Sequence, residues 1–210
     1  MISSSESDFD ADGTDDVLWH NVNGPVRLWS FTRGSVVPFT YQDLADVGSN
    51  WTFLGIADFD GDGKADVLWR NNNSGLVLLW NDPGASVPFN SQNLAVVGSD
   101  WTFLGIGDFD GDGKAGVLWR NNNNGIVRLW NDPAASVPFT YQDLARVGSD
   151  WASLGIGDFD GDGKADVLWR NNNNGIVRLW NDPAASVPFT YQDLAGVGSD
   201  WTFLPAQAHF

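Results

Sequence analysis

The chain has 210 residues, of which 42% are hydrophobic and 13% aromatic, enough to bury a core and to exclude a disordered chain. Its 27 acidic and 11 basic side chains give a formal charge of −16, so we expect no nucleic-acid partner and no membrane insertion. The absence of cysteine excludes disulfides, thiolate zinc sites and cysteine nucleophiles. Abundant Gly, Pro, Trp and Phe favour an all-β fold.

The two ends of the chain differ from the rest. Residues 1–7 have neither the basic start nor the apolar run of a signal peptide, and we expect a disordered or trimmed end there. Residues 205–210 follow the last strand pattern and are expected to form a tail. No apolar segment of about 18 residues occurs, so we expect no membrane-spanning helix.

Internal repetition dominates the remaining sequence. The segment WTFLGIADFDGDGKADVLWRNNNSG begins at Trp51 and returns from Trp101 and Trp151, and Asp8 begins a more divergent copy. A period of about fifty residues is typical of propellers and solenoids, in which each unit buries its faces against its neighbours. We therefore expect a single domain over residues 8–204. Its repeats are 8–50, 51–100, 101–150 and 151–204.

Each repeat contains four short strand patterns, which are clearest in the third copy. Residues 101–109 and 117–121 flank an Asp/Gly-rich loop, and the Asn-Gly pair before Ile126 is typical of a hairpin turn. Residues 126–131 then return antiparallel, and residues 136–144 supply a fourth strand that tolerates its proline only at an edge. Four antiparallel strands per repeat predict a β-propeller of four blades.

The two ends of the repeat region are complementary. Polar residues at positions 3, 4 and 6 stand where the second copy has Phe53, Leu54 and Ile56, so the first repeat lacks a usable first strand. Residues 201–204 form an extra first strand, which we expect to complete the first blade and close the ring. A chain boundary that happens to fall there is the alternative. Four blades could close within one chain, or form half of an eight-bladed ring in a homo-oligomer.

The loop after the first strand carries the strongest chemical motif. In DFDGDGKAD, carboxylates occupy positions 1, 3, 5 and 9, and a backbone carbonyl is available at position 7. Ca²⁺ takes six to eight oxygen ligands, and glycines let a short loop curl around it. The candidate metal ligands are Asp8, Asp10, Asp12, Thr14 and Asp16; Asp58, Asp60, Asp62, Lys64 and Asp66; Asp108, Asp110, Asp112 and Lys114; and Asp158, Asp160, Asp162, Lys164 and Asp166.

The third loop has Gly116 in place of the last aspartate, so we expect a weaker or empty site there. Position twelve is Trp69 rather than Glu, and strands flank the loop, which excludes an EF-hand. A solvated acidic turn is the alternative, but four carboxylates in nine residues repel one another unless a cation neutralises them. A glycosidase needs carboxylates with distinct roles across a substrate, so identical clusters favour a structural role, and we expect no enzyme activity.

The string DFDGDGKADVLWRN, followed by G-x-V-x-LW, resembles the FG-GAP-like repeats of the VCBS type. Its acidic loop resembles the calcium loops of integrin α-subunit propellers, and the resemblance covers Asp8 to about Leu204. It implies a β-propeller with calcium between the first two strands of each blade, in a secreted or cell-surface protein. Some relatives, including fungal Psathyrella-type lectins, bind sugars between blades, and others serve adhesion. Residues 131–133 depart from the Asn-Gly that such repeats often carry.

Tryptophan recurs on the first three strands of the repeats. A ring at the same position of every blade is more typical of core than of a ligand platform, and Trp69 shares a strand face with Val67. The third-strand tryptophans instead sit beside Asn-Asp pairs at strand ends, where we expect an exposed ring.

Planar polar groups beside aromatic faces suit sugar recognition, although solvated hairpin ends would carry the same residues. The candidate carbohydrate-binding residues are Arg70, Asn71, Trp80, Arg120, Asn121, Trp130, Tyr141, Arg170, Asn171, Trp180 and Tyr191. The second repeat has Leu78 and Ser91 in place of Arg and Tyr, which predicts fewer sites than blades.

Two classes of function remain open. The first is a calcium-stabilised, lectin-like propeller that binds glycans in repeated shallow pockets and gains avidity from repetition. The second is a structural, adhesion or protein-interaction propeller that binds no sugar.

Overall fold

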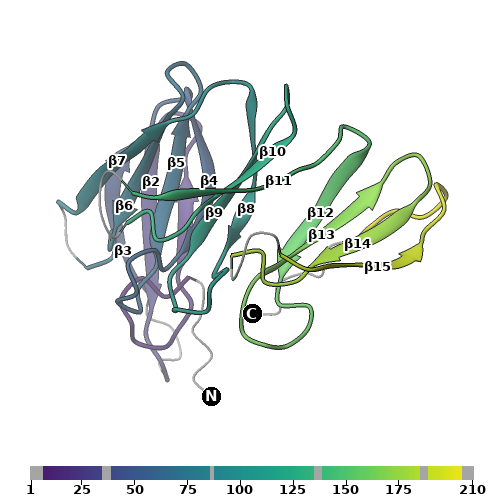
Figure 1. The fold of residues 1–210 in the computed structure, drawn as a ribbon. Helices are drawn as coiled ribbons and strands as arrows, with labels where there is room; N and C mark the ends of the chain where they lie inside the picture. Colours follow the sequence, from purple (N-terminus) through teal and green to yellow (C-terminus); the bar gives the residue numbers. More distant parts are fainter. Residues whose placement is uncertain (1–6, 35–38, 86–87, 135–138, 185–188, 205–210) are drawn as a thin grey trace. The chain divides into compact units, whose positions relative to one another are not determined.

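The structure is a computed structural model that describes residues 7–34, 39–85, 88–134, 139–184 and 189–204. Within these residues every regular element is a β-strand, and the strands form four antiparallel sheets, one for each repeat (Figure 1). The all-β repeat fold is therefore confirmed, and it is consistent with four propeller blades. None of the described residues form a helix long and apolar enough to cross a membrane.

The four sheets share one meander topology, in which each strand pairs with the next along the chain. The first sheet has β1 (Val17–His20), β2 (Pro25–Phe31) and β3 (Phe39–Asp46). The second has β4 (Trp51–Ala57), β5 (Asp66–Asn71), β6 (Leu76–Asn81) and β7 (Asn90–Val96). The third has β8 (Trp101–Gly107), β9 (Gly116–Asn121), β10 (Ile126–Trp130) and β11 (Tyr141–Arg146). The fourth has β12 (Trp151–Gly157), β13 (Asp166–Asn171), β14 (Ile176–Trp180) and β15 (Tyr191–Gly196).

The hairpin between the second and third strands follows from local turn chemistry. In the second sheet, Asn71 Oδ1 accepts hydrogen bonds from the N–H groups of Asn73 and Ser74, both at 3.0 Å. Gly75 then has a φ of 74°, which glycine adopts without strain. A Cβ at this position would lie 2.2 Å from the carbonyl oxygen of Val97, so only glycine fits.

The fourth strand of the third repeat differs from its prediction. It begins at Tyr141 rather than at 136 and ends at Arg146, and residues 135–138 lie outside the described part of the chain. Phe139 packs on Trp130, with ring centroids 4.7 Å apart, instead of extending the ladder. Strand pairing in this repeat thus starts later than the hydrophobic pattern indicates.

The sheets group into two compact units, the first two sheets in one and the last two in the other. The core of the first unit contains Phe9, Leu28 and Trp69, and thus combines residues of both its repeats. The core of the second unit contains Leu129 and Trp169 in the same way. Trp69, Trp119 and Trp169 are each 1% exposed, which confirms the core position predicted for Trp69 and its counterparts in the third and fourth repeats.

The first sheet and residues 201–204 belong to different compact units. The first sheet has three strands, and residues 201–204 belong to no strand and are exposed. Trp19 on β1 is 49% exposed, against 1% for Trp69. Completion of the first sheet by residues 201–204, within one chain or from a partner chain, stays a prediction.

The two chain ends lie mostly outside the described residues. Residues 1–6 and 205–210 are not described. Ser7, which the sequence places in the disordered end, is instead held by the loop that follows it. Its carbonyl accepts a hydrogen bond from the Asp16 N–H, and its hydroxyl donates to Asp15, both at 3.0 Å.

Candidate functional site

Each acidic loop connects the first and second strands of its repeat. In the second repeat it runs from the end of β4 to Asp66, the first residue of β5. Gly61 and Gly63 have φ values of 82° and 86°, which let the chain curl back on itself in a few residues. The loop therefore brings its carboxylates together on the inside of a tight turn.

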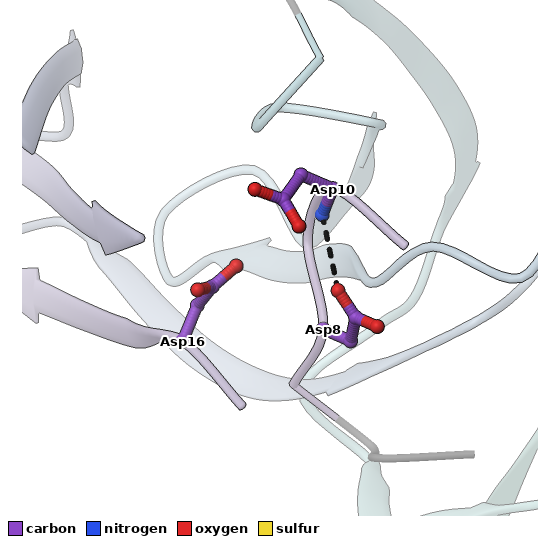
Figure 2. A group of neighbouring side chains, drawn as sticks. All are labelled: Asp8, Asp10 and Asp16. Atoms are coloured by element: carbon purple, nitrogen blue, oxygen red, sulfur yellow. Dashed lines mark hydrogen bonds between the residues drawn. The ribbon is translucent and has the colours of Figure 1, made fainter. Parts of the chain in front are cut away.

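In all four loops three carboxylates come close to one another. One oxygen from each lies within 4.8 Å of the others in every group. The groups are Asp8, Asp10 and Asp16; Asp58, Asp60 and Asp62; Asp108, Asp110 and Asp112; and Asp158, Asp160 and Asp166. Figure 2 shows the first group, in which the side chains of two chain segments converge and Asp8 accepts a hydrogen bond from the Asp10 N–H.

The aspartate at position nine has a second role as a buried clamp. Asp66 is fully buried, and its two oxygens accept hydrogen bonds from the N–H groups of Phe59 and Asp82, both at 2.9 Å. This carboxylate ties the acidic loop to the segment that follows the third strand. Burial raises the pKa of Asp66 to about 7 and that of Asp16 to about 6, because the charged form loses its hydration.

The third repeat lacks this clamp. Gly116 offers no carboxylate to the N–H groups of Phe109 and Asp132, the counterparts of Phe59 and Asp82. The backbone at Gly116 is also crowded, since a Cβ there would lie 2.9 Å from the carbonyl oxygen of Trp130. The third loop thus keeps its three-aspartate cluster and loses the bond that anchors it.

The donor set fits a hard cation such as calcium. The ligands available in the loops are oxygen atoms, and three carboxylates this close repel one another without a cation. Two buried oxygens beside the loops have no hydrogen-bond partner, Thr14 Oγ1 and Asn81 Oδ1. The amide nitrogen of Asn81 donates to Asp60 Oδ2 at 3.3 Å, which places this orphaned oxygen next to the cluster.

The third-strand tryptophans are not exposed, so that expectation is wrong. Trp80, Trp130 and Trp180 are only 4–5% exposed. Trp80 packs between Trp69 and Phe89, with ring centroids 5.3 Å and 4.8 Å away. The same three-ring stack recurs around the other two, so these rings fill the core instead of forming an open platform.

The arginines and asparagines at the end of the second strand bind the protein's own backbone. Arg70 donates to the carbonyls of Val97 and Gly98 at 2.9 Å and 3.0 Å, and Arg170 makes the equivalent pair of bonds. Arg120 does so too, and it also reaches the carbonyl of Trp151. Asn71, Asn121 and Asn171 hold the hairpin turns. These bonds favour the alternative given in the sequence analysis, in which these polar residues belong to the hairpin ends and do not recognise sugar.

Of the candidate sugar-binding residues, the two tyrosines are the most open. Tyr141 and Tyr191 are 58% and 59% exposed. The guanidinium carbon of Arg178 lies 4.2 Å from the Tyr191 ring and 4.5 Å from the Trp151 ring. Asp193 holds this arginine with two hydrogen bonds, of 2.6 Å and 3.0 Å.

The third repeat has the same arrangement, which the sequence argument missed. There Arg128 lies between Trp101 and Tyr141 and pairs with Asp143. A signal was available, because the second repeat keeps the tryptophan, as Trp51, but replaces the arginine, the tyrosine and the aspartate together, with Leu78, Ser91 and Asn93. Residues that change together in one repeat are expected to work together.

Each unit contains a pocket at the same position of its repeats. The pocket of the second unit has a volume of about 230 Å³, and that of the first about 360 Å³. The former is lined by residues 144–148 and by Trp151, Trp169, Arg178, Trp180, Phe189 and Tyr191. The latter has Asp46, Leu78 and Ser91 at the positions of Arg146, Arg178 and Tyr191. The two pockets therefore share an aromatic floor and differ in their polar groups.

Comparison with protein families identifies a repeat family. The FG-GAP-like repeat matches three times, over residues 8–69, 58–119 and 108–169, which together span more than half of the chain. No curated protein matches the sequence.

Proposed function

Because this chain belongs to the FG-GAP-like repeat family, we propose that it is a calcium-stabilised propeller protein that binds carbohydrate in the pocket of its second unit. The observation that carries the calcium proposal is the recurrence, in every repeat, of three carboxylates whose oxygens lie within 4.8 Å of one another. The carbohydrate proposal rests on the aromatic and guanidinium groups that line the second pocket.

In each loop, calcium would be held by the aspartates at positions one and three, by the aspartate at position five or position nine, and by the backbone carbonyl at position seven. Bound calcium supplies the positive charge that offsets carboxylate repulsion. The chain's own residues position the ligands. Gly63 N–H donates to Asp58 Oδ2 at 2.8 Å, which fixes that carboxylate, and Asp66 anchors the loop to the segment after β6. The role proposed for the metal is therefore to stabilise each sheet.

The second pocket has the chemistry that a sugar ring needs. The rings of Trp151 and Tyr191 offer flat apolar surface to the C–H groups of a pyranose. Arg178, which Asp193 holds in place, offers N–H donors to its hydroxyls. A pocket of about 230 Å³ lies just below the usual range for ligand sites and suits nothing larger than a monosaccharide. A single site of this kind should bind at about millimolar strength, or roughly −4 kcal/mol.

Isothermal titration calorimetry with N-acetylglucosamine, fucose and galactose, supported by a multivalent glycan array, tests the carbohydrate proposal. The variants Arg178→Leu and Tyr191→Ser introduce the residues that the second repeat carries naturally, so they preserve a side-chain pattern already compatible with this fold. We expect binding to the unmodified protein and its loss in both variants. Absence of binding across the array, or binding that both variants retain, would favour the structural or adhesion alternative.

Titration of the chelator-treated protein with calcium tests the metal proposal separately. We expect heat of binding and a higher melting temperature, and neither effect with sodium chloride at the same ionic strength. The absence of both would contradict calcium binding without bearing on the sugar result. We also propose a binding rather than a catalytic function and a secreted or cell-surface location, where weak calcium sites are common in extracellular modules.

A further inference from the structure

All three lysines of the chain lie at position seven of an acidic loop, as Lys64, Lys114 and Lys164. The Lys164 ammonium lies 3.0 Å from Asp162 Oδ2 in its own loop and 3.2 Å from Asp182 Oδ1 after the third strand. Lys114 makes the same two contacts at 2.9 Å and 4.0 Å, and Lys64 contacts Asp62 and Asp82. Each lysine therefore bridges two segments of its repeat.

The second aspartate of each bridge is held in an unusual conformation. Asp82, Asp132 and Asp182 have φ values of 45°, 42° and 44°, a region that residues other than glycine rarely adopt. Such a backbone persists only where its surroundings hold it, and here the N–H groups of Asp82 and Asp182 donate to the position-nine carboxylates. The segment is thus arranged to present a carboxylate to the lysine.

The first repeat lacks both the lysine and this aspartate. Thr14 stands at the lysine position and Phe31, whose N–H donates to Asp16 as that of Asp82 donates to Asp66, stands at the position of Asp82, so both partners are replaced together. The first loop nevertheless keeps Asp8, Asp10 and Asp16 within 4.8 Å of one another. The acidic cluster can therefore form without the lysine bridge.

We propose that Lys64, Lys114 and Lys164 act as internal counter-ions that compete with calcium and lower its affinity for the second, third and fourth loops. This inference rests on the calcium binding proposed above. The lysine ammonium bonds a carboxylate oxygen of the position-five aspartate, Asp62 in the second loop, that a metal ion would also use. Its charge also repels a nearby divalent cation. The bridge holds the metal-free loop closed and must be released as the ion binds.

Four equivalent glycine amides allow each loop to be followed separately by NMR. The N–H groups of Gly13, Gly63, Gly113 and Gly163 each donate to the position-one aspartate of their own loop, at 2.8–3.0 Å. Calcium should shift these four amide signals, and titration then gives one affinity for each loop. The first loop, which has no lysine, serves as the internal control for changes in overall charge.

The main test replaces Lys64, Lys114 and Lys164 together by methionine. We expect calcium affinity to rise about five- to tenfold at Gly63 and Gly163, as estimated from two partly exposed ion pairs per lysine, and to stay within about twofold at Gly13. The matching triple replacement by arginine keeps a positively charged side chain at each position and should keep the calcium affinity of the unmodified protein. In the presence of a chelator, the methionine variant should melt at a lower temperature than the arginine variant.

A reciprocal variant guards against a methionine protein that fails to fold. Thr14→Lys combined with Phe31→Asp builds the bridge into the first loop, and we expect calcium affinity at Gly13 to fall about five- to tenfold. Methylation of the lysines with ¹³C offers a second measurement, because methylation keeps the charge and labels only these three side chains and the N-terminal amine. Their signals should move to the positions of solvent-exposed lysine when calcium is added.

The outcomes separate this inference from the proposed function. An unmodified protein that binds no calcium overturns both. A protein that binds calcium, but with equal affinity in the lysine and methionine forms, overturns the inference alone. A methionine variant whose affinity rises equally at Gly13 also overturns it, because the effect would then come from overall charge.

Discussion

Removal of calcium should affect the four loops unequally. A ligand present at a hundred times its dissociation constant stabilises the folded state by about 2.7 kcal/mol per site. In a chain of this size each kcal/mol shifts the melting temperature by about 2–4 °C, so each occupied loop contributes about 5–11 °C. The first, second and fourth loops have the buried clamp of Asp16, Asp66 and Asp166, and the third has Gly116. We therefore expect three strong sites and one weak site.

Hydrogen exchange read by mass spectrometry measures this difference loop by loop. The N–H groups of Phe9, Phe59 and Phe159 donate to the clamp carboxylates at 3.0, 2.9 and 3.0 Å, whereas Phe109 has no such acceptor in its own loop. A stabilisation of about 2.7 kcal/mol corresponds to about a hundredfold lower population of the open state. Calcium should therefore slow exchange about a hundredfold in peptides that contain the first three amides, and much less at Phe109.

The control is the chelator-treated protein with sodium chloride added to the same ionic strength, which screens charges without filling a site. Unchanged exchange on adding calcium would refute metal binding in the loops. Equal protection at Phe109 and Phe59 would refute the argument that the position-nine carboxylate decides the strength of each site.

Three further predictions follow from the same geometry. Gly116→Asp should strengthen calcium binding in the third loop, and unchanged affinity at that loop by calorimetry would contradict this. The same change should cost about 1–3 kcal/mol of stability in chelator, measured by urea unfolding, because its Cβ meets the Trp130 carbonyl at 2.9 Å. Asp60→Asn should remove one calcium ion per chain by calorimetry, and an unaltered stoichiometry would show that Asp60 is not a ligand. If residues 201–204 complete the first sheet in the register of β4 on β5, where Thr52 pairs with Arg70, then Thr202→Cys and His20→Cys should form a disulfide. The native chain has no cysteine, so non-reducing electrophoresis would show whether that bond lies within one chain or between two, and no bond would argue against closure.

Much of the fold follows from local sequence alone. The repeat spacing, the Asn-Gly turns and the two-residue alternation along strands predict four antiparallel sheets, and the Asp/Gly loop predicts where carboxylates gather. The alternation also places Trp69 in the core. These features depend on residues close together in the chain, and their geometry is limited by the backbone itself.

Other features depend on what lies across the sheet or beyond it. Trp80 stands beside polar residues in the sequence, but Trp69 and Phe89 cover its ring in the folded protein. Arg70 likewise donates hydrogen bonds to backbone carbonyls 27 and 28 residues away. A side chain's exposure and partners are set by the neighbours that folding supplies, and these are often distant in sequence.

Contacts between residues distant in sequence also distinguish the aspartates that are candidate metal ligands from those that clamp the loop. Sequence spacing marks Asp66 as one more ligand in an acidic loop, and only the tertiary structure places the Asp82 N–H against its second oxygen. The bridge from Lys64 to Asp82 likewise joins residues 18 apart that no local pattern connects. Local sequence therefore determined which groups are available in this protein, and tertiary packing decided which of them are clamps, which are core and which remain open to a ligand.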